Sequence, residues 1–128
     1  MDKKIIFTAA IFGMFAIILG AFGAHALKNV LSIEELSTFE TGVKYQMYHA
    51  LFLLFIGTIN KLSQKTMKTI YYLVVFGIFS FSGSIYLLAT NNITAFDFRI
   101  IGFATPIGGV LLILAWAVLL FNIVNKKS

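Results

Sequence analysis

The chain has 128 residues, of which 59% are hydrophobic and only 12% are charged, and its mean hydropathy is +0.93. Soluble domains carry about 25% charged residues, so this composition indicates a membrane protein. Cysteine is absent, which excludes disulfides and thiolate metal sites or nucleophiles. The net charge of +5 comes from basic residues scattered at the ends of apolar segments, so we attribute it to topology and headgroup contacts rather than to nucleic-acid binding.

Residues 5–27 form an apolar run in which His25 is the only ionisable residue, and this pattern predicts the first membrane span. The segment covers roughly 34 Å at 1.5 Å per residue, which is enough to cross a hydrocarbon core of about 30 Å. It ends in LGAFGAHAL, where glycines and alanines surround His25. The sequence Ala24-His25-Ala26 is similar to a signal-peptide cleavage site, but the apolar run is longer than the usual 7 to 15 residues, so we expect no cleavage.

The connection that follows has helical character of its own. Ser32 and Glu35 fit the S-x-x-E capping box, and apolar residues recur after them at helical spacing. We therefore expect a short amphipathic helix near the membrane interface that leads into the second span at residues 42–60. The first half of that span is polar, and the three- and four-residue spacing of Tyr45, Gln46 and His49 places them on one face.

Two further apolar segments, residues 70–90 and 102–124, predict the third and fourth spans. Thr105-Pro106 is typical of an N-cap followed by proline at the first helical position, which would begin the fourth helix near Pro106. A helix that runs through residues 102–124 and is kinked at Pro106 is the alternative. The sequence thus predicts a single transmembrane domain over residues 1–128: an all-α, antiparallel four-helix bundle with an interfacial helix between spans one and two.

Four spans place both termini and the middle loop on one side of the membrane. Seven of the ten basic residues fall on that side, and the positive-inside rule then places both termini in the cytoplasm of a cell-membrane protein. A polar cluster is expected to gather toward the outer face: His25, Glu40, Lys44, Gln46, His49, Asp97 and Arg99. Asp97 and Arg99 are two residues apart, so they do not face each other on a helix and are interpreted as solvated interfacial charges.

Small residues recur at intervals of three and four along the predicted spans, which favours close packing between helices in lipid. A lipid or quinone groove is the alternative interpretation for the stripe in the first span. The residues expected to pack helices are Gly13, Ala16, Gly20, Ala24, Gly77, Ser80, Ser84, Gly108 and Gly109.

Each predicted span contains one short motif, and the four motifs in chain order are LGAFGAHALK, TGVKYQMYHAL, FSGSIYLL and TPIGG. Together they resemble the YgdD/YwdK-type family of small bacterial membrane proteins, to which animal transmembrane protein 256 is related. The resemblance covers essentially the whole chain. It implies a four-helix integral protein of the cell membrane without an assigned activity, and it carries over no catalytic residue.

The two histidines are the strongest chemical candidates in the sequence. His25 ends the first span and His49 lies near the start of the second, so antiparallel packing would bring them to similar depth. Imidazole is a common metal and haem ligand, but two residues are fewer than the three or four ligands of a usual zinc site. We expect each to hydrogen-bond to a neighbouring helix or headgroup, with a haem or metal site or a proton relay as alternatives.

No motif for nucleotide binding, metalloprotease or hydrolase activity is present. The leading hypothesis is therefore a non-enzymatic interaction, assembly or membrane-homeostasis protein, with no catalytic residue, no metal and no cofactor. Membrane lipids are its expected partners, together with a second copy or another membrane protein, but no nucleic acid. The alternatives are a small transporter or channel subunit that acts as an oligomer, and a haem- or quinone-binding protein that uses His25 and His49.

Overall fold

The computed structural model describes residues 2–91 and 102–125, and the described segments are helical apart from short turns. The elements are α1 (Asp2–His25), a 3-10 turn η1 (Leu27–Asn29), α2 (Ile33–Thr58), α3 (Gln64–Ile78), a π-helical turn η2 (Phe79–Gly83), α4 (Ser84–Ala89) and α5 (Ala104–Asn125). The axis of α3, η2 and α4 is continuous, so these three elements make one rod. The predicted all-α, antiparallel four-helix architecture is confirmed.

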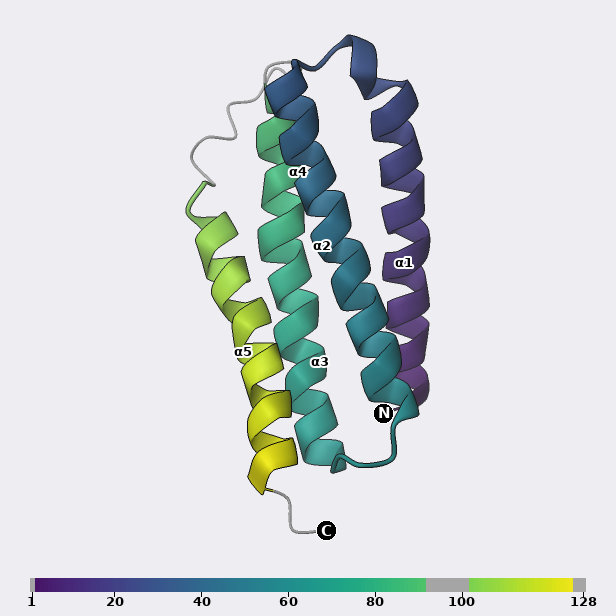
Figure 1. Cartoon of the computed structure of the whole chain (residues 1–128), viewed down its shortest axis with the longest axis vertical. Coiled ribbons are helices and arrows are strands. Elements are labelled where there is room, and N and C mark those ends of the chain that lie inside the picture. Colours follow the sequence, from purple (N-terminus) through teal and green to yellow (C-terminus); the bar gives the residue numbers. More distant parts are fainter. Residues whose placement is uncertain (1, 92–101, 126–128) are drawn as a thin grey trace.

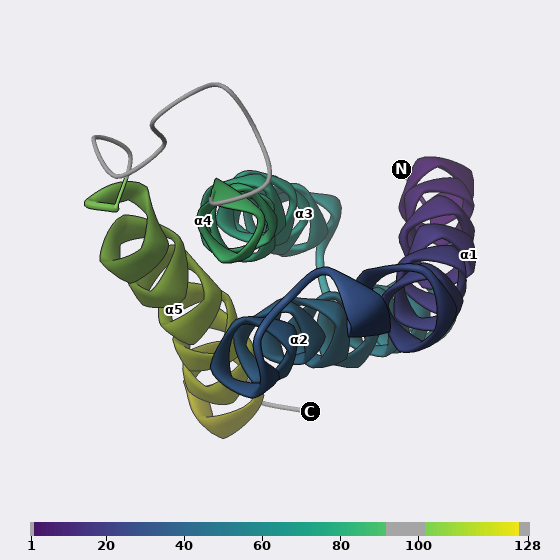
Figure 2. The same cartoon turned by 90° about the horizontal axis from the view of Figure 1, so that it is seen from above.

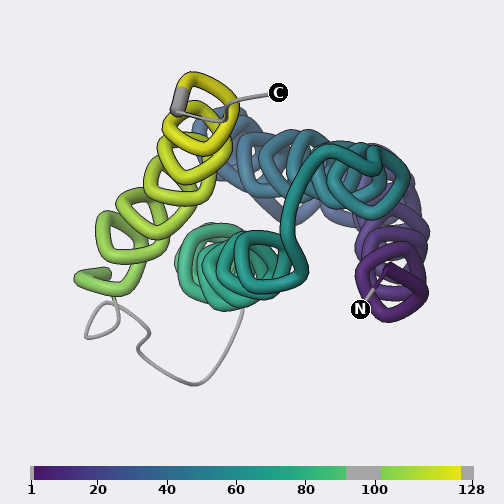
Figure 3. The backbone as a smooth tube through the Cα atoms, turned by 90° about the horizontal axis from the view of Figure 1, so that it is seen from below, coloured from purple at the N-terminus to yellow at the C-terminus, as the bar shows by residue number. Residues whose placement is uncertain are grey.

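The four rods alternate in direction, and each packs mainly against the next one along the chain (Figure 1). Helix α1 lies along α2, α2 lies along the α3–α4 rod, and α5 packs on α3 and η2. Seen from above, α1 and α5 flank the other two rods on opposite sides (Figure 2). The view from below shows the start of α1, the α2–α3 loop and the end of α5 at one end of the bundle (Figure 3). We call this the lysine-rich end, because Lys3, Lys4, Lys61, Lys65 and Lys68 lie there.

Within residues 2–91 and 102–125, three rods are long and apolar enough to cross a membrane: Asp2–His25, Gln64–Ala89 and Ala104–Val124. Helix α2 is as long, with 26 residues, but its first half carries acidic, basic and amide side chains. Because α1 and α3 begin at the same end of the bundle, α2 must return across the same thickness (Figure 1). Its length of about 39 Å exceeds a hydrocarbon core of about 30 Å, so its polar first turns fit the interface.

The start of α2 agrees with the sequence in one respect and differs in another. The Ser32 hydroxyl accepts a hydrogen bond from the Glu35 amide at 3.0 Å, and the Glu35 carboxylate accepts one from the Ser32 amide at 2.9 Å, so the predicted capping box is present. The expected short interfacial helix, however, is not a separate element. It forms the first turns of α2, because no glycine in a turn conformation or proline interrupts the helix before Thr58.

Small residues let α1 and α2 approach closely. A Cβ atom on Gly13 would lie 3.8 Å from the Ala50 Cβ, and one on Gly20 would lie 3.4 Å from Val43, while Ala16 is 1% exposed. The predicted stripe therefore faces α2 as far as Gly20. It then continues through Gly23, which packs against the Phe39 ring, whereas the predicted Ala24 is exposed. The contacts at residues 13, 16, 20 and 23 alternate in steps of three and four, as in a heptad seam, so the contact after Gly20 falls at Gly23.

The seam between the α3–η2 segment and α5 is tighter. A Cβ atom on Gly77 would lie 2.6 Å from a Leu112 methyl group, and one on Gly108 would collide with the backbone of Phe81. Gly109 faces the Phe81 ring at an ordinary 3.7 Å, and Ser80 is half-buried. The backbone of α5 thus lies directly on the π-helical turn, which only a glycine at position 108 permits.

Helix α5 begins at Ala104, two residues before Pro106. Proline is tolerated in the first turn because the amides there have no partner within the helix. The interpretation that the fourth helix starts near Pro106 is therefore close, but Thr105 lies inside the helix and its hydroxyl pairs with Ser84.

Two apolar clusters lie at different depths. The larger one, toward the lysine-rich end, includes Ile5, Leu53, Ile56, Ile70 and Val74. The smaller one, at the opposite end, comprises Leu27, Leu31, Phe39 and Ala89. The buried polar side chains lie between them.

Candidate functional site

Among the residues that the structure describes, four polar side chains are buried between the two apolar clusters: Gln46 (4% exposed), His49 (5%), Ser82 (0%) and Ser84 (3%). We call them, with their hydrogen-bond partners, the interior polar layer. Polar groups at membrane depth are costly unless they are paired, and in such positions they mark either sites or helix contacts. The hydrogen-bond partners of these side chains show whether they form a functional site or a contact between helices.

Gln46 joins three rods. Its amide nitrogen donates to the Phe12 carbonyl oxygen of α1 at 2.8 Å, and its amide oxygen accepts from the Tyr86 hydroxyl of α4 at 2.6 Å. Both ends of the side chain are therefore used by other helices. The arrangement fixes α2 against α1 and α4 at one depth.

His49 joins α2 to α5. Its Nε2 accepts a hydrogen bond from the Trp116 indole nitrogen at 3.1 Å, and its Nδ1 lies 2.8 Å from the Tyr45 carbonyl oxygen. An indole N–H only donates, so Nε2 carries no proton and Nδ1 donates to Tyr45. Phe52 stacks on the Trp116 ring with centroids 4.1 Å apart, which holds the indole in place. Both ring nitrogens of this neutral imidazole are occupied.

Two serines complete the layer. Ser82, in the π-helical turn, donates to the Gly42 carbonyl oxygen of α2 at 2.8 Å. Ser84 bonds to the Phe81 carbonyl oxygen in its own rod and to the Thr105 hydroxyl of α5. The interior polar layer thus contacts all four rods.

The structure does not bring the two histidines together. His25 is the last residue of α1 and is exposed, whereas His49 is buried. His25 lies near the start of α2, and at 1.5 Å per residue His49 lies about 24 Å from Ile33 along the helix axis. The depths are therefore different, because α2 begins directly after the η1 turn and His49 belongs to its middle.

The residues of the predicted outer polar cluster take separate places. Gln46 and His49 point into the bundle, while His25, Glu40 and Lys44 are exposed toward the end opposite the lysines. Asp97 and Arg99 lie outside the described residues. The three- and four-residue spacing placed Tyr45, Gln46 and His49 on one face, and of these the structure buries Gln46 and His49 and leaves Tyr45 40% exposed. Charge and polarity alone did not separate the two buried residues from the exposed ones.

Four residues of the interior polar layer were missed by the sequence reasoning: Ser82, Tyr86, Thr105 and Trp116. The helical spacing predicted Ser80 and Ser84 but not Ser82, because the π-helical turn shifts the register of the small-residue face there. The only signal for the others was a hydrogen-bonding group within an apolar span, which indicates a polar contact without naming the partner.

Chemically, the layer is saturated. Within the described residues, every buried side-chain nitrogen or oxygen atom has a hydrogen-bond partner. No group of three or more His, Cys, Asp or Glu residues capable of holding a metal ion occurs in residues 2–91 and 102–125. Two grooves of about 330 and 320 Å³ open beside the layer, one next to Gln46 and the other next to His49 and Trp116.

Long apolar helices, joined by buried polar side chains that all have hydrogen-bond partners, define a helical, multi-pass membrane protein. The chain belongs to the DUF423 family of proteins of unknown function, whose sequence profile matches residues 19–109. The resemblance in the four span motifs is thereby confirmed.

Several relatives are similar over most of their length. A UPF0382 membrane protein of Staphylococcus saprophyticus is 47% identical over 94% of this chain and 96% of its own. The UPF0382 membrane protein YwdK of Bacillus subtilis is 40% identical over 89% of this chain and 90% of its own. The inner membrane protein YgdD of Escherichia coli is 35% identical over 93% and 88%, respectively. No solved structure matches the chain.

Proposed function

We propose that the chain is a non-enzymatic scaffold of the cytoplasmic membrane, acting in the interaction, assembly or homeostasis of membrane components. The saturation of the interior polar layer carries this proposal. Gln46, His49, Ser82 and Ser84 are all engaged in joining helices, so no buried nucleophile, base or ligand set is left free among the described residues. The layer serves to fix the relative rotation of the rods.

The outer surface supports the same proposal. Large apolar side chains on the flanking helices are half exposed or more, among them Phe7 and Ile17 on α1 and Ile113 and Phe121 on α5. In a membrane such surfaces contact lipid tails, a second copy of the chain or another membrane protein. A rigid rod assembly with two apolar flanks is a suitable platform for such contacts.

The scaffold proposal is tested by purifying the full chain in mild detergent from the cell membrane and identifying what accompanies it. We expect a visible absorption spectrum without cofactor bands and a co-purifying membrane protein or second copy at fixed stoichiometry. The variant Gln46→Leu should reduce that association, because the rods are no longer fixed, whereas Tyr48→Phe, on the exposed side of α2, should leave it unchanged. A stoichiometric haem, quinone or metal that disappears in His49→Ala would contradict the proposal.

We also propose that the lysine-rich end faces the cytoplasm. Five lysines lie at this end within the described residues, against Lys28 and Lys44 toward the other, where Glu34, Glu35 and Glu40 also lie. Basic residues next to spans are retained on the cytoplasmic side, whereas acidic residues have little influence. Both termini follow from this orientation, since α1 begins and α5 ends at the lysine-rich end (Figure 1).

The lack of native cysteine makes the orientation directly measurable. Asn29→Cys and Asn60→Cys place one thiol at an exposed position at each end of the bundle. In intact cells stripped of their wall, a membrane-impermeant maleimide should label Asn29→Cys and leave Asn60→Cys unlabelled until the membrane is opened. The reverse pattern would overturn the orientation.

A further inference from the structure

We propose that the groove between α3 and α5 near the lysine-rich end binds one anionic phospholipid of the leaflet at that end. Its phosphate group would lie beside Lys65 and Lys68, and one acyl chain would lie against Leu73, Phe76 and Leu111. The inference goes beyond the scaffold function and does not depend on it.

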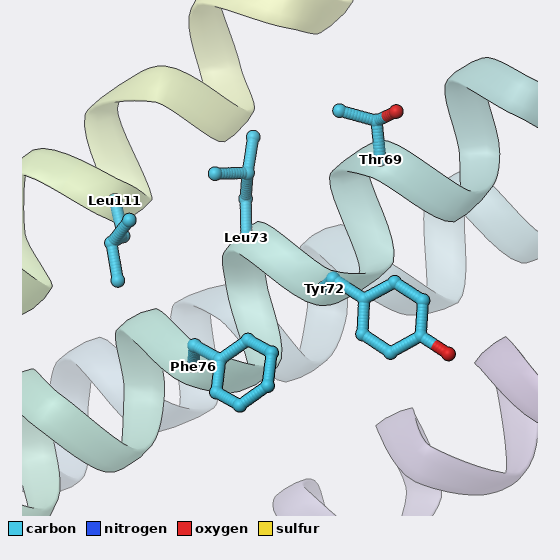
Figure 4. A pocket seen from close by; sticks show the side chains of 5 residues that line it. All are labelled: Thr69, Tyr72, Leu73, Phe76 and Leu111. Atoms are coloured by element: carbon cyan, nitrogen blue, oxygen red, sulfur yellow. The ribbon is translucent and has the colours of Figure 1, made fainter.

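The groove has a volume of about 370 Å³ and is lined by Thr69, Tyr72, Leu73, Phe76 and Leu111 (Figure 4). Its wall exposes only apolar surface. Thr69 and Tyr72 lie toward the start of α3, while Phe76 lies one turn further into the membrane-spanning part. From residue 69 to residue 76 the groove extends about 10 Å along the helix, in the direction that an acyl chain takes in a bilayer.

Positive charge gathers at the mouth of this groove. Lys65 precedes Thr69 by four residues and Lys68 precedes Tyr72 by four, so each lies one helical turn before a groove residue on the same face. The Lys4 ammonium group lies 5.3 Å from the centroid of the Tyr71 ring and 5.6 Å from that of Tyr72. Three cationic side chains are therefore within reach of one headgroup.

These three ammonium groups are not neutralised by any residue that the structure describes. Within residues 2–91 and 102–125, Lys4, Lys65 and Lys68 form no ion pair, and the Asp2 carboxylate accepts a hydrogen bond from Gln64 at 3.4 Å. Lys65 also lies in the first turn of α3, where the helix dipole disfavours a positive charge. An external anion would neutralise the charge of these lysines. Helix stability does not explain the presence of Lys65 in the first turn of α3.

The arrangement matches the two ends of a phospholipid. Lys65 and Lys68 lie in the first turns of α3, at headgroup level, and the apolar groove begins one helical turn further along the helix. Tyr72 is 37% exposed and lies at their boundary, as interfacial tyrosines do. A soluble phosphate would leave the groove empty, and a lipid without net charge would leave the lysines unpaired, so charge complementarity favours the anionic lipid.

The test is native mass spectrometry of the full chain released from detergent that contains phosphatidylglycerol or phosphatidylcholine with the same acyl chains. We expect one phosphatidylglycerol to remain bound and phosphatidylcholine to be lost. The double variant Lys65→Gln, Lys68→Gln should weaken retention about thirty-fold, since each lysine near an anionic headgroup contributes a factor of about five. The control Lys28→Gln, Lys44→Gln removes two lysines toward the opposite end and should retain the lipid like the original chain.

A second variant tests the acyl chain separately from the charge. Thr69→Trp fills the groove from an exposed position and keeps the net charge, so it should lose phosphatidylglycerol while its thermal unfolding stays unchanged. Glycerol phosphate, which has the headgroup chemistry without the chains, should not be retained. Equal retention of the two lipids, or retention of phosphatidylglycerol by Thr69→Trp or by the double lysine variant at the original level, would overturn the proposal.

Discussion

At the scale of single residues, Gln46 shows how a polar side chain is accommodated inside this membrane protein. Its amide meets one donor and one acceptor from two other rods. Such hydrogen bonds contribute about 0.6 kcal/mol on average in membrane proteins, up to about 1.7. Gln46 thus contributes more through the alignment that it imposes on α1, α2 and α4 than through its hydrogen-bond energy.

The Gln46–Tyr86 contact gives a stability prediction. Tyr86→Phe removes the hydroxyl and leaves the Gln46 amide oxygen without a partner, so we expect a loss of about 1 kcal/mol in the free energy of unfolding. Tyr48→Phe is the matched control, because the Tyr48 side chain is 53% exposed and should give no change. Denaturant unfolding in detergent measures both. If the losses from Tyr86→Phe and Gln46→Leu simply add in the double variant, the contact is not a coupled one.

The tautomer of His49 is a second prediction at this scale. The Trp116 donor requires an unprotonated Nε2 and a protonated Nδ1. Nitrogen-15 NMR of the imidazole in the His25→Asn variant, which leaves His49 as the sole histidine, should show this tautomer. In Trp116→Phe the preference should weaken, because Nε2 loses its donor. A spectrum dominated by the Nε2-protonated form would contradict the geometry.

Among single-residue contacts, the local ones could be predicted from the sequence and the long-range ones could not. The capping box of Ser32 and Glu35 is local, so it was readable from a spacing of three. The His49–Trp116 and Ser82–Gly42 contacts join residues far apart in the chain, and they depend on how each rod is rotated. The sequence indicates that polar side chains within apolar spans need hydrogen-bond partners, but only the packed structure identifies those partners.

At the scale of elements, the junction of α5 with the π-helical turn is the tightest contact. The Gly108 position lies on the Phe81 backbone, and neighbouring Gly109 has room for a methyl group. π-helical turns often occur at functional positions. In this chain the turn directs Ser82 toward α2 while α5 packs closely on the same turn.

The two adjacent glycines provide a matched pair of substitutions. Gly108→Ala should lower the melting temperature clearly, because the new methyl group meets backbone that cannot move aside. Gly109→Ala should leave it unchanged or raise it, since alanine favours a helix over glycine by about 1 kcal/mol. Thermal unfolding of both variants in the same detergent is the measurement. Equal melting temperatures would mean that α5 does not pack as described.

The sequence predicted the helices better than it predicted the contacts of single residues. The helices α1, α3–α4 and α5 correspond to predicted spans, because long apolar runs have few alternatives. The unbroken course of α2 was missed, since its polar first half and apolar second half look like two segments. Of the predicted stripe of Gly13, Ala16, Gly20 and Ala24, the first three lie on the α2 side of α1, and the seam continues through Gly23 instead of Ala24.

At the scale of the whole molecule, the order of the rods can be tested by cross-linking. Gly13→Cys and Ala50→Cys place two thiols across the α1–α2 seam, where the Cβ atoms would lie 3.8 Å apart, within the range for a disulfide. Mild oxidation should join them, as seen by mass and by gel mobility. Gly13→Cys with Ala115→Cys is the control, because α1 and α5 lie on opposite sides of the bundle (Figure 2). Cross-linking of the control pair within one chain would refute the arrangement.

The position of α2 has a consequence for biogenesis. It is the least apolar of the long rods, yet it is flanked by α1 on one side and by the α3–α4 rod on the other. A segment with this many polar groups partitions poorly into lipid on its own. We therefore expect α1 and α2 to enter the bilayer together as a helical hairpin, because the hydrogen bond from the Gln46 amide nitrogen to the Phe12 carbonyl oxygen forms only when both helices are present.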